Sequence, residues 1–121
     1  MRAHVRRLIP ALALACAGAA ALAETEAPVD IVEARTQLSA ADRDLNDLYQ
    51  RCTAPEAATV QSIAALREAQ RKWLEVRDLT ARAYQLNESS REPKDDEHYI
   101  HAQAVMTWSR VEELKSLFGC E

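Results

Sequence analysis

Small or apolar side chains between residues 31 and 52 recur in alternating steps of three and four residues. The set is Ile31, Ala34, Leu38, Ala41, Leu45, Leu48 and Cys52. This spacing brings the side chains to one face of an α-helix, so it predicts a first helix over this range. Asp30, followed three residues later by Glu33, matches a helix-capping pattern and predicts where that helix begins.

A second and longer helical pattern follows Cys52. Its main face consists of Val60, Ile63, Leu66, Gln70, Trp73, Arg77, Thr80 and Tyr84, with Leu74 and Ala81 beside it. Thr53, followed by Pro55 and Glu56, has the form of a capping box with proline in the first turn. The pattern therefore predicts a helix that starts here and runs to about Leu86.

A polar segment and a third helical pattern complete the chain. Residues 87–94 are rich in turn-forming residues and predict an exposed loop. Asp95 or Asp96 is expected to cap the third helix, and Gly119 is expected to end it. The inward set of this helix is Tyr99, Ile100, Gln103, Met106, Arg110, Leu114 and Leu117. Three helices with short connections predict an all-α fold, a small up-down-up three-helix bundle.

The first 23 residues follow a different pattern. The chain starts with a positively charged segment that contains Arg2, Arg6 and Arg7. An apolar run from Leu8 to Leu22 follows, and Ala21 and Ala23 supply the small residues that a signal peptidase recognises. We predict a signal peptide in residues 1–23 and a helical domain in residues 24–121. The apolar run is shorter than the roughly 20 residues of a membrane-spanning helix, so we expect no transmembrane segment in the mature chain.

Cys16 allows a second way of processing the leader, by lipidation. A cysteine late in an apolar leader can be lipidated and become the first residue of a lipoprotein. The preceding residues, Ala13 to Ala15, lack the leucine that usually stands three positions before such a cysteine. We therefore expect cleavage after Ala23 and a periplasmic or secreted protein, with lipid anchoring through Cys16 as the alternative.

Cleavage makes the domain distinctly acidic. The full chain has a formal net charge of -4, and loss of the three leader arginines takes it to -7. Nucleic acid is therefore not an expected partner, because binding to phosphate backbones depends on clustered lysine and arginine. A cationic protein is easier to accommodate.

Removal of the leader also leaves one pair of cysteines, Cys52 and Cys120. In an oxidising compartment an isolated pair predicts one disulfide, although two free thiols remain the alternative. The first and third helices of an up-down-up bundle run parallel, so their ends lie at the same pole and the two cysteines can meet. Closing a loop of this length would stabilise a small fold by about 4 kcal/mol.

Polar residues occupy several positions that otherwise point inward. Gln70, Arg77 and Arg110 need hydrogen-bonding or charged partners there, since burying them alone is costly. The candidate partners are Asn46, Tyr49, Asp78 and Glu113. Two interpretations stay open: a buried network that fixes the helix register, or a binding site for a ligand or partner that is built on the same residues.

Three spaced motifs resemble a known family. The first is Leu45-Asn46-x-x-Tyr49, the second runs from Leu66 to Asp78 and contains Ala69-Gln70, Trp73 and Arg77-Asp78, and the third is Thr107-x-x-Arg110-x-x-x-Leu114. Together they resemble the domain of the LprI-type lysozyme inhibitors, small exported bacterial proteins, over most of the mature chain. Members commonly carry a cysteine three residues after the Arg-Asp pair, where this chain has Ala81, and another shortly before the Thr-x-x-Arg motif, where it has none.

The resemblance implies a protein that binds and inhibits a lysozyme or a related muramidase. An acidic stretch, Glu92, Asp95, Asp96 and Glu97, is the candidate contact for a cationic lysozyme. The alternative for this stretch is a solvated loop with a helix cap. The alternative for the whole domain is a structural or adaptor protein that binds another envelope component and inhibits nothing.

The sequence offers little for an enzyme or a metal. No serine or cysteine has a potential general base at a spacing typical of a catalytic pair, and no cofactor motif is present. His98 and His101 lie one turn apart beside Asp95 and Glu97, but that spacing lacks a clear fourth ligand. We expect these histidines to be solvated surface residues, and we predict no enzyme, cofactor or metal.

Overall fold

A computed structural model describes residues 30–120. The predicted signal peptide, the cleavage point after Ala23 and the alternative anchor at Cys16 lie outside the described residues. Within residues 30–120, no helix is both long and apolar enough to cross a membrane.

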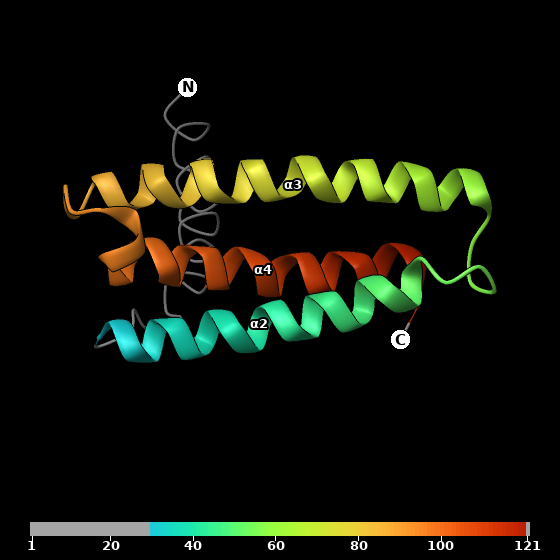
Figure 1. The fold of residues 1–121 in the computed structure, drawn as a ribbon, viewed down its shortest axis with the longest axis horizontal. Coiled ribbons are helices and arrows are strands. Elements are labelled where there is room, and N and C mark those ends of the chain that lie inside the picture. Colours follow the sequence, from blue (N-terminus) through green and yellow to red (C-terminus); the bar gives the residue numbers. More distant parts are fainter. Residues whose placement is uncertain (1–29, 121) are drawn as a thin grey trace, which may run out of the picture.

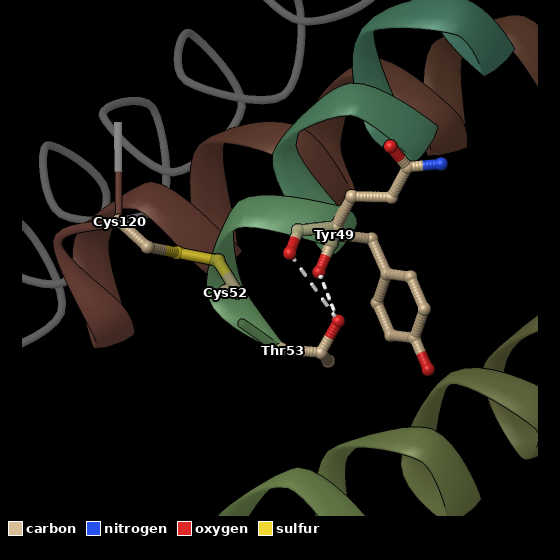
Figure 2. Close-up of a disulfide and its surroundings, with 5 residues drawn as sticks. Tyr49, Cys52, Thr53 and Cys120 are labelled. Carbon is tan, nitrogen blue, oxygen red and sulfur yellow. Dashed lines mark hydrogen bonds between the residues drawn. A yellow bond between two sulfur atoms is a disulfide. The ribbon is translucent and has the colours of Figure 1, made fainter. Parts of the chain in front are cut away.

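The first helix, α2 (Ile31–Cys52), follows the predicted apolar face closely. Its buried side chains are Ala34, Ala41, Leu45, Leu48 and Cys52. The backbone N–H of Glu33 donates to Asp30 Oδ1 over 2.8 Å, which confirms the predicted cap. Thr53 caps the end of the helix, and its hydroxyl donates to the carbonyl of Tyr49 over 2.8 Å (Figure 2).

The second helix, α3 (Val60–Leu86), starts later than the sequence predicts. Thr53 bonds back to the end of α2 and lies too far before Val60 to cap α3, and residues 54–57 form a turn closed by the Ala57 N–H and the Ala54 carbonyl. Thr59 is the actual cap, since its hydroxyl accepts from the N–H of Ser62 over 3.1 Å. The predicted capping box at Thr53 to Glu56 is therefore wrong, whereas the end at Leu86 is confirmed.

The third helix, α4 (Glu97–Phe118), follows a single 3-10 turn, η1 (Pro93–Asp95). Asp96 is its cap, because Asp96 Oδ1 accepts from the N–H of His98 over 2.8 Å. Gly119 ends it with a φ of 60°, a left-handed conformation that glycine adopts without steric cost. Both predicted boundaries of this helix are confirmed.

The three helices form an up-down-up bundle, as predicted (Figure 1). Helices α2 and α4 run in the same direction, α3 runs against them, and α4 lies between the other two. The predicted inward faces are wrong at five positions. Val60 is 81% exposed at the start of α3, and Leu117 is 68% exposed at the end of α4, where both lie at helix ends. On α3, Leu74 and Tyr84 are each 40% exposed and Thr80 is exposed as well, because α3 packs against α4 along a narrower face than the sequence predicts.

A cluster of buried apolar side chains lies toward the pole where α2 and α4 end. Its buried members are Leu45, Leu48, Cys52, Leu66, Val111 and Leu114, with Tyr49, Trp73 and Cys120 packed against them. Cys52 and Cys120 form a disulfide, with 5.1 Å between their Cα atoms and a sequence separation of 68. Figure 2 shows this bond joining the ends of α2 and α4. The predicted disulfide is confirmed.

Candidate functional site

Two arginines and a tryptophan form the centre of the contact between α3 and the rest of the bundle. The guanidinium carbon of Arg77 lies 5.6 Å from the centroid of the Trp73 ring, and that of Arg110 lies 5.7 Å from it. Arg77 and Trp73 come from α3, one helical turn apart, and Arg110 comes from α4. A cation near an aromatic face is attracted by the ring's negative charge density. Trp73 therefore binds both arginines.

Arg77 is held by groups from all three helices. Its Nε donates to Asp78 Oδ1 over 2.8 Å, and its Nη1 donates to Asp42 Oδ1 on α2 over 3.3 Å and to Thr107 Oγ1 on α4 over 3.4 Å. Only 11% of its side chain is exposed. The positive charge is thus largely buried, but it is paired with two carboxylates that are 44 and 46% exposed, which makes its burial tolerable.

Arg110 is held in a similar way at the neighbouring turn. Its Nε donates to Gln70 Oε1 over 3.1 Å, and its Nη1 donates to Glu113 Oε1 over 2.9 Å. A third connection joins the same two helices, since Gln103 Nε2 on α4 donates to Asp78 Oδ1 over 2.9 Å. We call this set the polar seam. It consists of Asp42, Gln70, Trp73, Arg77, Asp78, Gln103, Thr107, Arg110 and Glu113.

The structure brings together most of the motif residues singled out in the sequence. Those in the polar seam are Gln70, Trp73, Arg77, Asp78, Thr107 and Arg110. Asn46 and Tyr49 lie elsewhere. Asn46 is exposed on the wall of an open groove along α2, and Tyr49 packs against the apolar cluster. Asp42, one turn before Asn46 on α2, supplies the contact that the sequence assigned to Asn46 or Tyr49.

The buried polar groups of the seam are already paired with one another, so few of them are available to bind a small-molecule substrate. Among residues 30–120, every buried side-chain nitrogen and oxygen has a hydrogen-bond partner. Each arginine faces a carboxylate, and each is about nine-tenths buried. Such a network holds α3 in a defined register on α4. The carboxylates of Asp42, Asp78 and Glu113 at its edge are 44, 46 and 51% exposed.

A second polar cluster anchors the loop between α3 and α4. Gln85, fully buried at the end of α3, donates from Nε2 to Asp96 Oδ2 over 3.1 Å and to the carbonyl of Arg91 over 2.7 Å. Arg82 Nη1 donates to the same carbonyl over 3.2 Å. Gln85 has no special signal in the sequence, because its role depends on how the loop folds back over it.

Asp96 is fully buried and ionised. Burial opposes its ionisation, but hydrogen bonds from Ser89, His98 and Gln85 outweigh that effect and hold the pKa of Asp96 well below its usual value. Of the candidate acidic contact residues, Asp96 is therefore a structural cap, and its burial contradicts a role in direct contact with a partner.

The other acidic residues of the loop are more accessible. Glu97 accepts two hydrogen bonds from Arg91 Nη2, at 2.8 and 2.9 Å, and Asp95 lies 3.8 Å from Arg35 Nη2. The backbone N–H of Glu97 itself and then Arg91 lower the pKa of the Glu97 carboxyl. Glu92 is exposed, as is Glu88 before it. The loop is thus ordered by internal pairs while it presents Glu88, Glu92 and Asp95 to solvent.

The two histidines do not lie on one surface. His101 is 6% exposed and its Nδ1 lies 3.4 Å from Gln37 Oε1 on α2, so the expectation of a solvated residue is wrong for His101. Its position on α4 faces the tightly packed α2, which the sequence pattern did not reveal.

Asp96, Glu97 and His98 bring possible metal ligands within 4.8 Å of one another, but the guanidinium of Arg91 contacts both carboxylates.

The family assignment follows from a comparison with family models. A model described as lysozyme inhibitor LprI matches residues 16–114. The chain belongs to the LprI lysozyme inhibitor family. The match spans α2, α3 and most of α4, and it includes every residue of the polar seam. Membership in the LprI family implies a lysozyme-inhibitor-like protein, not an enzyme. Comparisons with curated proteins and with solved structures gave no match.

Proposed function

We propose that this protein is an exported inhibitor that binds a lysozyme or a related muramidase and blocks its cleft. The observation that carries the proposal is the LprI family match over residues 16–114. The polar seam supports it indirectly, because its two arginines are already paired with carboxylates and hold the helices in a fixed arrangement. An inhibitor of this kind acts by occlusion and needs no catalytic group.

The loop between α3 and α4 is the proposed contact. Residues 88–97 contain five acidic and two basic side chains, a net charge of -3. A negative surface attracts a cationic partner over several ångströms and speeds the encounter. The internal pairs of Asp96 and Glu97 reduce this field, whereas Glu88 and Glu92 remain exposed and are the residues assigned to contact.

The anchoring of the loop favours the same role. Gln85 fixes the loop at Asp96 and at the Arg91 carbonyl, and Arg82 adds a further bond. A contact surface that is already ordered loses less conformational entropy on binding than a flexible one. The buried Gln85 and Asp96 are therefore expected to support binding without touching the partner.

The test is a titration of lysozyme with purified protein comprising residues 24–121 in its oxidised form. The expected result is loss of cell-wall hydrolysis as the protein approaches micromolar excess. Unchanged hydrolysis with several c-type lysozymes and a bacterial muramidase would reject inhibition. Capture of a different envelope protein, with no effect on hydrolysis, would support the adaptor alternative.

Two double variants locate the contact. Glu88→Lys with Glu92→Lys changes the loop charge by four units and is expected to weaken inhibition at least roughly tenfold. Asp44→Lys with Asp47→Lys makes the same change on exposed positions of α2 and is the matched control. Equal weakening by both pairs would show that net charge, not the loop, attracts the partner.

The proposed location is the periplasm or the exterior, after cleavage of residues 1–23. Intact mass measurement of the protein purified from an exporting host tests this directly. A mature chain that begins at Glu24 supports the proposal, while a diacylated or triacylated chain that begins at Cys16 would establish the lipoprotein alternative.

A further inference from the structure

A second regular pattern runs along the exposed side of α3, and it starts at Ala65 and Ala69, which line an open groove beside the end of α4. Seven exposed positions recur in alternating steps of four and three residues: Ala65, Ala69, Lys72, Val76, Leu79, Ala83 and Leu86. We call them the outer seam. Six of the seven are aliphatic, and the spacing is the heptad pattern by which one helix packs along another. At 1.5 Å per residue, the outer seam extends for about 30 Å.

The outer seam is more aliphatic than the side by which α3 joins the bundle. Within α3, only Leu66, Ala81 and Gln85 are buried. Val76, Leu79 and Leu86 of the outer seam are 55, 72 and 55% exposed. A helix that packs on one side alone normally has the reverse distribution, with its aliphatic side chains inward. A regular row of exposed aliphatic residues indicates an interaction surface.

We propose that the outer seam pairs with the outer seam of a second copy of this chain in an antiparallel dimer. Placing Val76 of one copy against Leu79 of the other sets the register. The same register places Lys72 against Ala83, and Ala69 against Leu86. A long side chain then faces a small one in each outer layer, which fills the interface without overlap.

The charges beside the outer seam fit this register. Glu75 and Arg82 both occupy the flanking position that precedes a heptad core residue, and the antiparallel register brings Glu75 of each copy beside Arg82 of the other. Glu75 is exposed and makes one loose ion pair, 3.7 Å to Arg71 Nη1. The two hydrogen bonds of Arg82 both leave from Nη1, so its other nitrogens remain able to donate.

A parallel pair fits less well. It would place Lys72 against Lys72 and Ala83 against Ala83, which brings like charges together and leaves space between small side chains. Charge and size complementarity therefore select the antiparallel arrangement. This pairing does not depend on lysozyme inhibition, and it uses a surface on α3 rather than the loop that follows it.

The dimer is tested by sedimentation velocity on oxidised protein comprising residues 24–121, from low micromolar to roughly millimolar concentration. The expected result is a dimer that dissociates on dilution. Leu79→Glu is expected to raise the dissociation constant on the order of 100-fold, because a carboxylate replaces a central apolar side chain in each copy. Val60→Glu is the matched control, since Val60 is 81% exposed on the same helix but lies outside the outer seam.

Cross-linking tests the register. When Val76→Cys protein is mixed with Leu79→Cys protein, oxidation is expected to give mainly the mixed disulfide between copies. Preferential Leu79→Cys homodimers would indicate a parallel pair and overturn the proposal. It would also be overturned by a monomer at all concentrations, or by a dimer that Leu79→Glu leaves intact. If the wild type stays monomeric and Leu79→Glu weakens lysozyme inhibition instead, then lysozyme, not a second copy, covers this seam.

Discussion

Helices α2 and α3 both pack against α4, but they do so by different physical means. Helix α2 contributes Ala34, Ala41, Leu45, Leu48 and Cys52, all 3% exposed or less. Helix α3 contributes three buried residues, of which one is Gln85, and it otherwise meets α4 through the polar seam. The alanines of α2 allow close approach of the two backbones, whereas α3 is held at a greater distance by arginine, glutamine and tryptophan.

The apolar contact of α2 and the polar contact of α3 contribute different properties to the fold, stability in the first case and register in the second. Apolar burial contributes free energy in proportion to the area removed from water and does not depend on direction. Hydrogen bonds and ion pairs contribute less net free energy, but they are satisfied in one register only. We infer that α2 and α4 form the stable unit, and that α3 is positioned accurately but is the first helix to separate.

The largest expected effect is on the α2 and α4 unit. Replacing Cys52→Ser and Cys120→Ser together is expected to lower the free energy of unfolding by about 4 kcal/mol, because the unfolded chain regains the freedom of a loop of 68 residues. Urea denaturation of the oxidised wild type and of the double variant measures this. Equal midpoints would show that the apolar contact alone determines the stability of the unit.

The next effect concerns the apolar side of the same unit. Leu48→Ala is expected to cost about 3 kcal/mol, since Leu48 is 1% exposed within the core cluster and its loss leaves a cavity. Val60→Ala, at an 81% exposed position of α3, is the control and should change stability by less than about 0.5 kcal/mol. Comparable losses at both positions would contradict the contrast between the helices.

A smaller effect is expected at the polar seam. Arg77→Met keeps much of the side-chain volume but removes the bonds to Asp42, Asp78 and Thr107. We expect a loss of about 1 to 2 kcal/mol, reduced by the solvent exposure of the two carboxylates. Hydrogen exchange should show faster exchange in α3 than in α2 or α4. Uniformly faster exchange in all three helices would show that α3 does not open separately.

The apolar unit was also the easier part to predict from sequence. The regular face of α2 and the glycine at the end of α4 are local signals, and the structure confirms both. The start of α3 was predicted wrongly because Thr53 can bond backward or forward along the chain, and the capping pattern alone does not decide which. The pattern of α3 was misleading for a further reason, since both its inward and its outward positions include aliphatic residues.

The candidate site was predicted only in part, for reasons of geometry. The motif spacing identified Arg77 and Arg110 as inward cations and named Asp78 and Glu113 as partners, and the structure contains both pairs. Asp42 was missed because polar residues occur on successive turns of α2, and their spacing does not show which of them reaches Arg77. Gln85 was missed because its partners belong to a loop whose path has no periodic signal.

The smallest expected effect concerns the polar contact between His101 on α4 and Gln37 on α2. Burial, and then the nearby His98, lower the pKa of His101, while Glu33 opposes them. The folded protein therefore binds a proton at His101 less readily than the unfolded chain, whose histidine has a pKa of about 6.5. As the pH falls through about 6.5, the unfolded state gains protons first, and the free energy of unfolding decreases.

Urea denaturation at several values between pH 7.5 and 5 measures this decrease, which we expect to stay below about 1 kcal/mol. His101→Gln retains a group able to bond Gln37 on α2 but does not titrate, so it should remove the part of the slope that belongs to His101. His98 is present in both proteins, and the difference between them isolates His101. Equal slopes of the free energy of unfolding against pH in the two proteins would show that the contact between His101 and Gln37 opens to water. The packing of α2 against α4 would then be looser at this turn than the alanine and leucine contacts indicate.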